Sequence, residues 1–230
     1  MGLRTRRFAN ERLVVLFALG AASGLCLALE LARERRYGST DYRFLFWNLI
    51  LAWIPLVVAL VIYDRYRRGT PVARLAPALV LWLLFLPNAP YIVTDFVHLS
   101  DATAAPLWFQ GIELSAYAWT GMLLGFVSLY LVHAVVRHRF GASAGWAGAF
   151  GVLMLVSAGV YLGRVKRWNS WDLLTRPGSR LAELHAHLDD PLSLGRAFGA
   201  TVAMTALLLL AYLVFYGLVG TRLDLQRQRP

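Results

Sequence analysis

Two stripes of polar residues lie inside apolar stretches of the sequence and could form a binding or catalytic site. Each stripe occupies positions i, i+3, i+7 and i+10, which fall on one face of a helix. The first consists of Asn88, Tyr91, Asp95 and His98, and the second of Gln110, Glu113, Tyr117 and Thr120. Ionisable residues inside membrane segments are costly and commonly functional. The spacing therefore locates a candidate site without naming its reaction.

Asp95, His98 and Glu113 are the candidate catalytic residues of these stripes. Carboxyl groups and an imidazole can serve as general acids and bases. The same three side chains are also a possible ligand set for a metal ion. The alternative is that the polar groups satisfy one another and only hold the helices together.

Two carboxylates at a similar depth repel each other unless a cation lies between them. Arg164 and Arg167, near the end of the fifth apolar stretch, are the cations that the expected topology brings closest to Asp95 and Glu113. Our hypothesis is that one of these arginines neutralises the two carboxylates.

The predicted pocket draws its binding residues from several segments of the chain. They are Asn48, Asn88, Tyr91, Asp95, His98, Glu113, Tyr117, Arg164, Arg167, Asn169 and Asp172. The sequence leaves the cofactor unknown, and it contains no Walker loop, Gly-x-Ser-x-Gly elbow or His-Glu-x-x-His helix. His185 and His187 are two residues apart and point to different sides of a helix, so we interpret them as solvated histidines.

The elements that position these residues are predicted to be membrane-spanning helices. The sequence is 58% hydrophobic and 16% charged, whereas an average soluble domain has about 25% charged residues. Apolar stretches of about 20 residues, long enough to cross a bilayer, cover residues 13–32, 44–63, 75–98, 107–136, 146–165 and 197–219. We expect an all-α membrane bundle of about six helices and a single domain over residues 1–230, with an interfacial amphipathic segment at 168–190.

Pro87 and Pro90 stand inside the third stretch, on either side of Asn88. A proline lacks the backbone donor of a helix, and its ring clashes with the carbonyl four residues before it. The sequence therefore predicts that the third helix is broken at this place.

Residues 100–106 form a short connection, so the helices on either side are expected to pack as an antiparallel hairpin. Folding the chain about the middle of this connection would bring Asn88 level with Tyr117 and Asp95 level with Gln110. The two polar stripes would then match in depth and line one pocket in the outer half of the membrane.

The net charge of +10 comes from arginines and one lysine that lie mostly at the ends of the apolar stretches. This distribution is typical of anchors that face anionic lipid headgroups. Membrane lipids are therefore the expected partners, and nucleic acid is not. Cys26 is the only cysteine, which excludes an intrachain disulfide.

Both termini are predicted to be cytoplasmic in the inner membrane. With the N-terminus inside, the inner segments carry 13 Lys and Arg residues and the outer segments 10, in the direction of the positive-inside rule. The connection at 100–106 has no Lys or Arg, which supports this orientation, while the six of residues 164–196 oppose it. The basic start and the first apolar stretch are interpreted as an uncleaved helix.

Three segments of the chain have a distinctive sequence. The first reads Leu86-Pro-Asn-Ala-Pro-Tyr-Ile-Val-Thr-Asp-Phe-Val-His-Leu99, the second Asn48-Leu-Ile-Leu-Ala-Trp-Ile-Pro55, and the third Gly163-Arg-Val-Lys-Arg-Trp-Asn-Ser-Trp-Asp172. Together they resemble an uncharacterised bacterial membrane family, the domain of unknown function 1361. The resemblance implies a multi-pass inner-membrane protein and supplies no activity.

The leading hypothesis is a multi-pass protein of unknown activity whose outer polar pocket binds a lipid headgroup, an anionic ligand or a metal. One alternative is a small intramembrane enzyme acting on a lipid-linked substrate, although the sequence has no known catalytic motif. Another is a transporter or accessory membrane subunit. Few polar groups in the predicted inner half, where the fourth stretch has only Ser128 and His133, weigh against transport. The sequence does not identify a protein partner.

Overall fold

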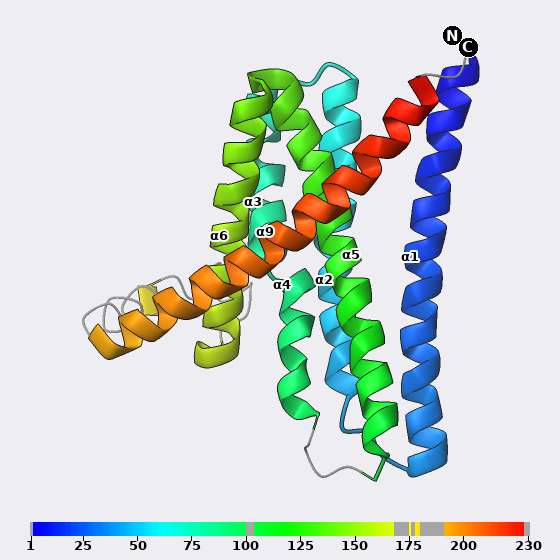
Figure 1. Cartoon of the computed structure of the whole chain (residues 1–230), viewed down its shortest axis with the longest axis vertical. Helices are drawn as coiled ribbons and strands as arrows, with labels where there is room; N and C mark the ends of the chain where they lie inside the picture. The colour runs from blue at the N-terminus through cyan, green and yellow to red at the C-terminus, as the bar shows by residue number, and fades with distance from the viewer. Residues whose placement is uncertain (1, 100–103, 168–174, 176–177, 180–190, 228–230) are drawn as a thin grey trace. The chain divides into compact units, whose positions relative to one another are not determined.

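The protein is all-helical in the computed structural model, which describes residues 2–99, 104–167, 175, 178–179 and 191–227 (Figure 1). No strand occurs within these ranges. Six of the described segments are long and apolar enough to cross a membrane: Glu11–Tyr37, Arg43–Arg67, Val72–His98, Leu107–Phe140, Ala142–Val165 and Leu192–Gly220. The predicted all-α membrane fold class is therefore confirmed.

The long helices extend beyond the apolar stretches that predicted them. Their bounds are α1 (Gly2–Tyr37), α2 (Arg43–Arg67), α5 (Leu107–Phe140), α6 (Ala142–Lys166) and α9 (Pro191–Arg227). A charged residue ends an apolar stretch but not a helix, because Arg, Glu and Lys are good helix formers. The predicted interfacial segment at 168–190 lies almost entirely outside the described residues.

The third candidate span consists of several short helical elements. A 3₁₀ turn η1 (Val72–Leu75) leads into α3 (Ala76–Phe85), and after a turn at Leu86 and Pro87 the chain continues as α4 (Asn88–Tyr91) and a 3₁₀ helix η2 (Ile92–His98). The interruption between α3 and α4 lies at the predicted position. Neither Pro87 nor Pro90 can donate the backbone hydrogen bond that would continue an α-helix there.

The chain divides into two compact units. Unit 1 contains Met1–Trp53 and Asn88–Gly125, that is α1, the start of α2, α4, η2 and the first half of α5. Unit 2 contains Ile54–Pro87 and Phe126–Pro230, that is the rest of α2, η1, α3, the second half of α5, α6 and α9.

In unit 1, the segment of α4 and η2 packs along the first half of α5 (Figure 1). At Gly121 a Cβ atom would lie 2.6 Å from the Ala89 carbonyl oxygen, so only glycine permits this approach. The hairpin is confirmed by this contact, but the predicted register is wrong. A symmetric fold about the middle of the connection would set Ala89 beside Ala116, one turn earlier on α5. The predicted register assumed an evenly divided connection, whereas the start of α5 reaches beyond the end of η2 on the side of this connection (Figure 1).

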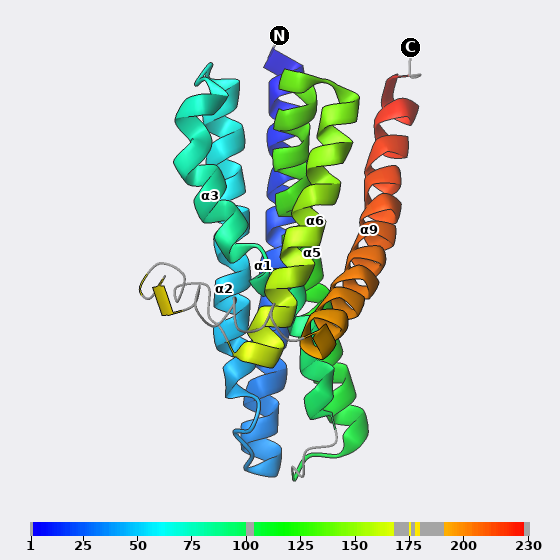
Figure 2. The ribbon, with the colours of Figure 1, turned by 90° about the vertical axis from the view of Figure 1, so that its left-hand side faces the viewer.

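In unit 2, α6 and α9 lie side by side (Figure 2). Ser128 of α5 links two other helices, because Trp82 Nε1 of α3 donates to its Oγ at 2.7 Å and that Oγ donates to the Pro55 carbonyl of α2 at 2.9 Å. His133 Nδ1 lies 2.9 Å from the Tyr212 hydroxyl of α9. Ser128 and His133, the two polar groups noted in the second half of α5, are thus engaged in bonds between helices.

Candidate functional site

A fully buried ion pair joins α1 and α5 in unit 1. Arg33 Nε donates to Glu113 Oε2 at 2.7 Å, and both side chains are 0% exposed. Arg33 Nη2 lies 2.6 Å from the same oxygen but is not aligned with it as a hydrogen bond. The guanidinium carbon also lies 4.1 Å from the ring centroid of Tyr42, a distance at which cation and ring attract. The arginine is therefore held by a carboxylate on one side and an aromatic ring on another.

A second carboxyl group, that of Glu30, belongs to the same cluster. Glu30 precedes Arg33 by about one turn of α1, is 6% exposed and interacts electrostatically with Glu113. Tyr117, one turn after Glu113 on α5, is fully buried and completes the set. We refer to Glu30, Arg33, Glu113 and Tyr117 as the Arg33 cluster.

The Arg33 cluster contains most of the buried polar atoms that have no hydrogen-bond partner among the described residues. They are both carboxyl oxygens of Glu30, Glu113 Oε1, Arg33 Nη1 and Nη2, and the Tyr117 hydroxyl. An unpaired buried polar group costs about 1–3 kcal/mol, and more when it is charged. The cluster therefore has binding capacity that the ion pair does not use.

The charges of the Arg33 cluster do not balance. One guanidinium faces two carboxyl groups, so the cluster has one negative charge in excess when all three groups are ionised. A buried charge is stable only when it is paired and hydrogen-bonded. Either a proton shared by the Glu30 and Glu113 carboxyl groups, which interact with each other, or a bound cation would balance the cluster.

A hydrogen-bond network ties the connection between α1 and α2 to the end of η2, the start of α5 and the connection between them. The Tyr42 hydroxyl lies 2.8 Å from the His98 carbonyl oxygen and 2.9 Å from Gln110 Oε1, so its proton can serve either acceptor. Gln110 Nε2 in turn donates to the Ala105 carbonyl at 2.8 Å. Because Tyr42 also stacks under Arg33, this network fixes the guanidinium against the start of α5.

Asn48 and Asp95, two of the predicted binding residues, are brought together by the fold. Asn48 Nδ2 donates to Asp95 Oδ2 at 3.1 Å, and Asp95 is 1% exposed. The bond connects α2 to η2, elements that are far apart in the sequence. Asn48 is thus one partner of the Asp95 carboxylate.

The remaining predicted residues are distributed over both units. Asn88, Tyr91 and His98 are half-buried in the segment of α4 and η2, and the His98 ring packs edge-on against Phe44. Arg164 is half-buried in α6 and Arg167 is exposed just after it, so both belong to unit 2. Asn169, Asp172, His185 and His187 lie outside the described residues.

Glu113 pairs with Arg33 of α1, whereas the hypothesis expected Arg164 or Arg167 there. The part of the hypothesis that concerns Asp95 stays a prediction. The predicted first helix ends at residue 32, which leaves Arg33 among the charges of the following connection. In the structure α1 continues to Tyr37, which places Arg33 on a helical face beside α5. The available signal was the spacing of Glu30 and Arg33, since residues i and i+3 share a helix face.

A metal site built from Asp95, His98 and Glu113 gains no support. Within the described part of the chain, no group of three or more His, Cys, Asp or Glu side chains is placed to hold a metal ion. Glu113 already pairs with Arg33 through its Oε2 atom.

Residues 47–216 match the family described as a protein of unknown function, DUF1361. The chain belongs to this family. No curated protein and no solved structure matches the chain. The DUF1361 match includes Glu113, Tyr117, Asn48 and Asp95, whereas Glu30, Arg33 and Tyr42 precede it. The Arg33 cluster thus joins the matched region to a helix that lies before it.

Proposed function

We propose that this multi-pass membrane protein binds a small monovalent cation at the Arg33 cluster. The observation that carries the proposal is the second buried carboxyl group, that of Glu30, beside an ion pair that is already complete. One bound cation would make the cluster neutral. Three carboxylate oxygens without donors, two on Glu30 and one on Glu113, are available as ligands.

A purely structural ion pair would not require Glu30. The Arg33–Glu113 pair has short contacts and complete burial without it. A second buried carboxylate is repelled by that of Glu113, and burying it costs roughly several kcal/mol in lost hydration. Its presence is therefore better explained by a ligand than by packing.

The charge of the cluster selects among the ligands that the sequence left open. An anionic ligand or anionic headgroup would face a site that already has one negative charge in excess. A transition metal would need more His, Cys, Asp or Glu ligands than the described residues bring together. A monovalent ion such as Na⁺, K⁺ or NH₄⁺ needs only oxygen ligands, and NH₄⁺ can also donate hydrogen bonds to them.

The enzyme hypothesis is not favoured by the contacts of its candidate residues. Asp95 accepts a hydrogen bond from Asn48, and Glu113 pairs with Arg33. The two predicted acids are thus engaged by different neighbours. For location, we propose the inner membrane with cytoplasmic termini, which the charge-free connection at 100–106 supports.

Thermal unfolding of the purified protein in detergent tests the cation site. We expect NaCl, KCl or NH₄Cl to raise the Tm of the wild type relative to choline chloride at equal ionic strength. A ligand at ten times its Kd stabilises by about 1.4 kcal/mol, which corresponds to about 3–6 °C for a chain of this size. Glu30→Gln should abolish this difference, because it removes the excess charge while keeping the shape of the side chain.

Glu34→Gln is the matched control. Glu34 lies one turn after Glu30 on the same helix, but its carboxylate is paired with Arg43 at 2.6 Å and is partly exposed. The Glu34→Gln protein should keep the cation response of the wild type. A wild type that responds equally to all four salts would contradict the proposal and leave a proton as the charge that neutralises the cluster.

A further inference from the structure

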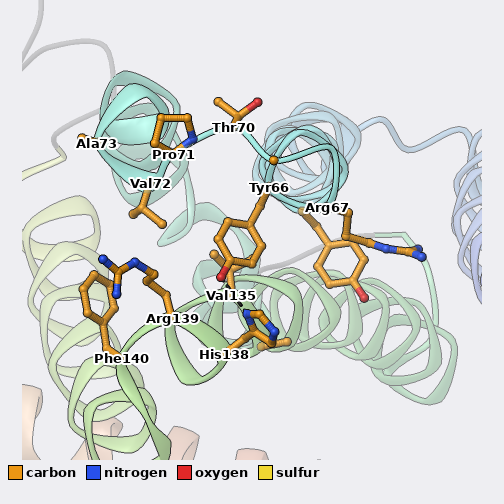
Figure 3. A pocket seen from close by; sticks show the side chains of 13 residues that line it. Tyr66, Arg67, Thr70, Pro71, Val72, Ala73, Val135, His138, Arg139 and Phe140 are labelled. Carbon is orange, nitrogen blue, oxygen red and sulfur yellow. Dashed lines mark hydrogen bonds between the residues drawn. The ribbon is translucent and has the colours of Figure 1, made fainter.

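Unit 2 contains an open cleft of about 1050 Å³ between the end of α2 and the end of α5 (Figure 3). One wall is formed by the last turn of α2, the turn that follows it and η1. The other wall is the last turns of α5. The lining residues are Tyr63, Tyr66, Arg67, Gly69, Thr70, Pro71, Val72, Ala73, Ala134, Val135, His138, Arg139 and Phe140.

Glycines with positive φ end both helices at this cleft. At Gly69, with φ of 89°, the amides of Gly69 and Thr70 donate to the carbonyls of Tyr66 and Arg65, which is the Schellman arrangement. At Gly141, with φ of 94°, the amide donates to the Arg137 carbonyl. Both caps stop the helices sharply and turn the chain, which sets the two walls of the cleft.

Arginines and a tyrosine–histidine pair give the cleft its polar groups. The Tyr66 hydroxyl lies 2.7 Å from His138 Nδ1 in the middle of the cleft, with Arg139 on one side and Arg67 on the other (Figure 3). The Arg67 guanidinium lies 5.8 Å from the Tyr63 ring centroid and that of Arg139 lies 5.1 Å from the Phe140 ring centroid. These aromatic contacts restrict both guanidinium groups without neutralising them.

The electrostatic balance of the region favours an anion. The two helix C-termini contribute roughly half a negative charge each. Against this, residues 65–74 and 137–139 contain six arginines and no acidic residue. Asp64, at the edge of the first stretch, reduces the excess by one charge only. The arginines therefore do more than offset the helix ends.

The rest of the lining is apolar and suits the glycerol and upper acyl region of a lipid. Val72, Ala134, Val135 and Phe140 contribute aliphatic or aromatic surface between the charged groups. Arg67, His138 and Arg139 are exposed, so a headgroup can reach them from outside the protein. Arginine binds phosphate oxygens with parallel hydrogen bonds from its planar fork.

We propose that this cleft binds an anionic membrane phospholipid, whose phosphate group is held by either Arg67 or Arg139, the arginines on its two sides. The cleft is separate from the Arg33 cluster, which belongs to unit 1. The two sites have opposite excess charge and therefore select different ligands.

Lipid retention by the full-length protein tests this proposal. The protein is purified from nanodiscs that contain equal amounts of phosphatidylglycerol and phosphatidylcholine, and bound lipids are counted by native mass spectrometry. We expect the wild type to retain phosphatidylglycerol preferentially. Arg67→Gln combined with Arg139→Gln should lower that preference several-fold, because both arginines that could hold the phosphate lose their charge.

Two variants separate a specific site from a general effect of charge. Arg35→Gln combined with Arg36→Gln removes the same charge from exposed positions at the end of α1 and should leave the preference unchanged. Arg67→Lys combined with Arg139→Lys keeps the charge and should retain part of it. The proposal is overturned if the Arg35/Arg36 and Arg67/Arg139 glutamine variants lose the phosphatidylglycerol preference equally. It is also overturned if the Arg67/Arg139 glutamine variant keeps the preference of the wild type.

Inorganic phosphate distinguishes a lipid from a soluble phosphate compound. In detergent, 10 mM phosphate should not displace bound phosphatidylglycerol. This concentration is about ten times the Kd of a weak anion site that binds at roughly 1 mM. Saturable phosphate binding that is lost in the Arg67/Arg139 glutamine variant, without any lipid preference in the wild type, would replace the lipid by a soluble ligand and overturn the assignment.

Discussion

At the scale of residues, two ion pairs with the same N–O distance differ in burial. Arg33 and Glu113 lie 2.6 Å apart and are both 0% exposed, whereas Arg43 and Glu34, also 2.6 Å apart, are 65% and 27% exposed. Solvent screens the second pair and its side chains lose entropy when they are held together. The Arg33–Glu113 pair is not screened in this way, because neither side chain is exposed to solvent. Distance alone therefore says little about the energy of either pair.

Removing Arg33 should strongly destabilise the protein. Arg33→Leu leaves Glu113 as an uncompensated buried charge, which costs about 3–5 kcal/mol. Combining Arg33→Leu with Glu113→Gln should cost less than the two single changes added together, because the carboxylate that Arg33→Leu leaves without its partner is then absent. The measurement is the free energy of unfolding by denaturant in detergent.

The exposed pair provides the comparison for this cycle. Arg43→Leu and Glu34→Gln should each leave the free energy of unfolding almost unchanged, and their double variant should show no coupling. The argument fails if the unfolding free energies lost by the Arg33 and Glu113 single variants simply add up in the double variant. It also fails if the variants of the exposed Arg43–Glu34 pair lose as much.

At the scale of elements, close contact between α4 and α5 depends on one glycine. A Cβ atom at Gly121 would lie 2.6 Å from the Ala89 carbonyl oxygen and 2.9 Å from Ile92 Cδ1. The first of these atoms is backbone and cannot rotate away. The α4 and η2 segment would have to move as a whole.

Gly121→Ala should therefore destabilise unit 1 by about 1–3 kcal/mol, the usual cost of overpacking. Gly111→Ala is the control on the same helix, since its Cβ would meet only Leu99 Cδ1 at 4.0 Å. The control should be neutral or stabilise by up to about 1 kcal/mol through helix propensity. Thermal unfolding in detergent separates the two, and equal Tm values for both variants would contradict the packing argument.

At the scale of the whole molecule, both units contain residues of α2 and α5. The chain passes from one unit to the other at Trp53–Ile54, Pro87–Asn88 and Gly125–Phe126. Each passage lies at or next to a proline or glycine, since Pro55 follows the first by one residue. The orientation of the chain in the membrane concerns both units, because α2 and α5 each contribute residues to both.

The proposed orientation predicts that a cysteine at Ala102 is labelled from outside intact cells. Cys26 is the only native cysteine and is buried, so a Cys26→Ala background gives a clean reading. A cysteine at Arg68, in the basic turn after α2, should react only after permeabilisation. The reverse pattern would invert the topology, and it would place the phospholipid cleft at the outer leaflet.

The number and type of the helices could be predicted from the sequence because both depend on local properties. The length of an apolar stretch determines whether it can cross a bilayer, and two prolines within four residues mark where a helix cannot continue. The hairpin of α4, η2 and α5 also followed from a short connection. Its register did not, since the path of the connection depends on side chains that pack against it.

The composition of the candidate site was decided by tertiary structure. Polar spacing identified Glu113, Tyr117 and Asp95, but it could not show that Glu113 pairs with Arg33, 80 positions away. That choice depends on the rotation of α1 about its axis and on the depth at which its basic end lies. Both are set by packing between helices, which no property of one segment determines. The cleft of unit 2 also depends on tertiary structure. The glycine caps at Gly69 and Gly141 are ordinary helix ends in the sequence, and they border a cleft only because the fold brings the ends of α2 and α5 together.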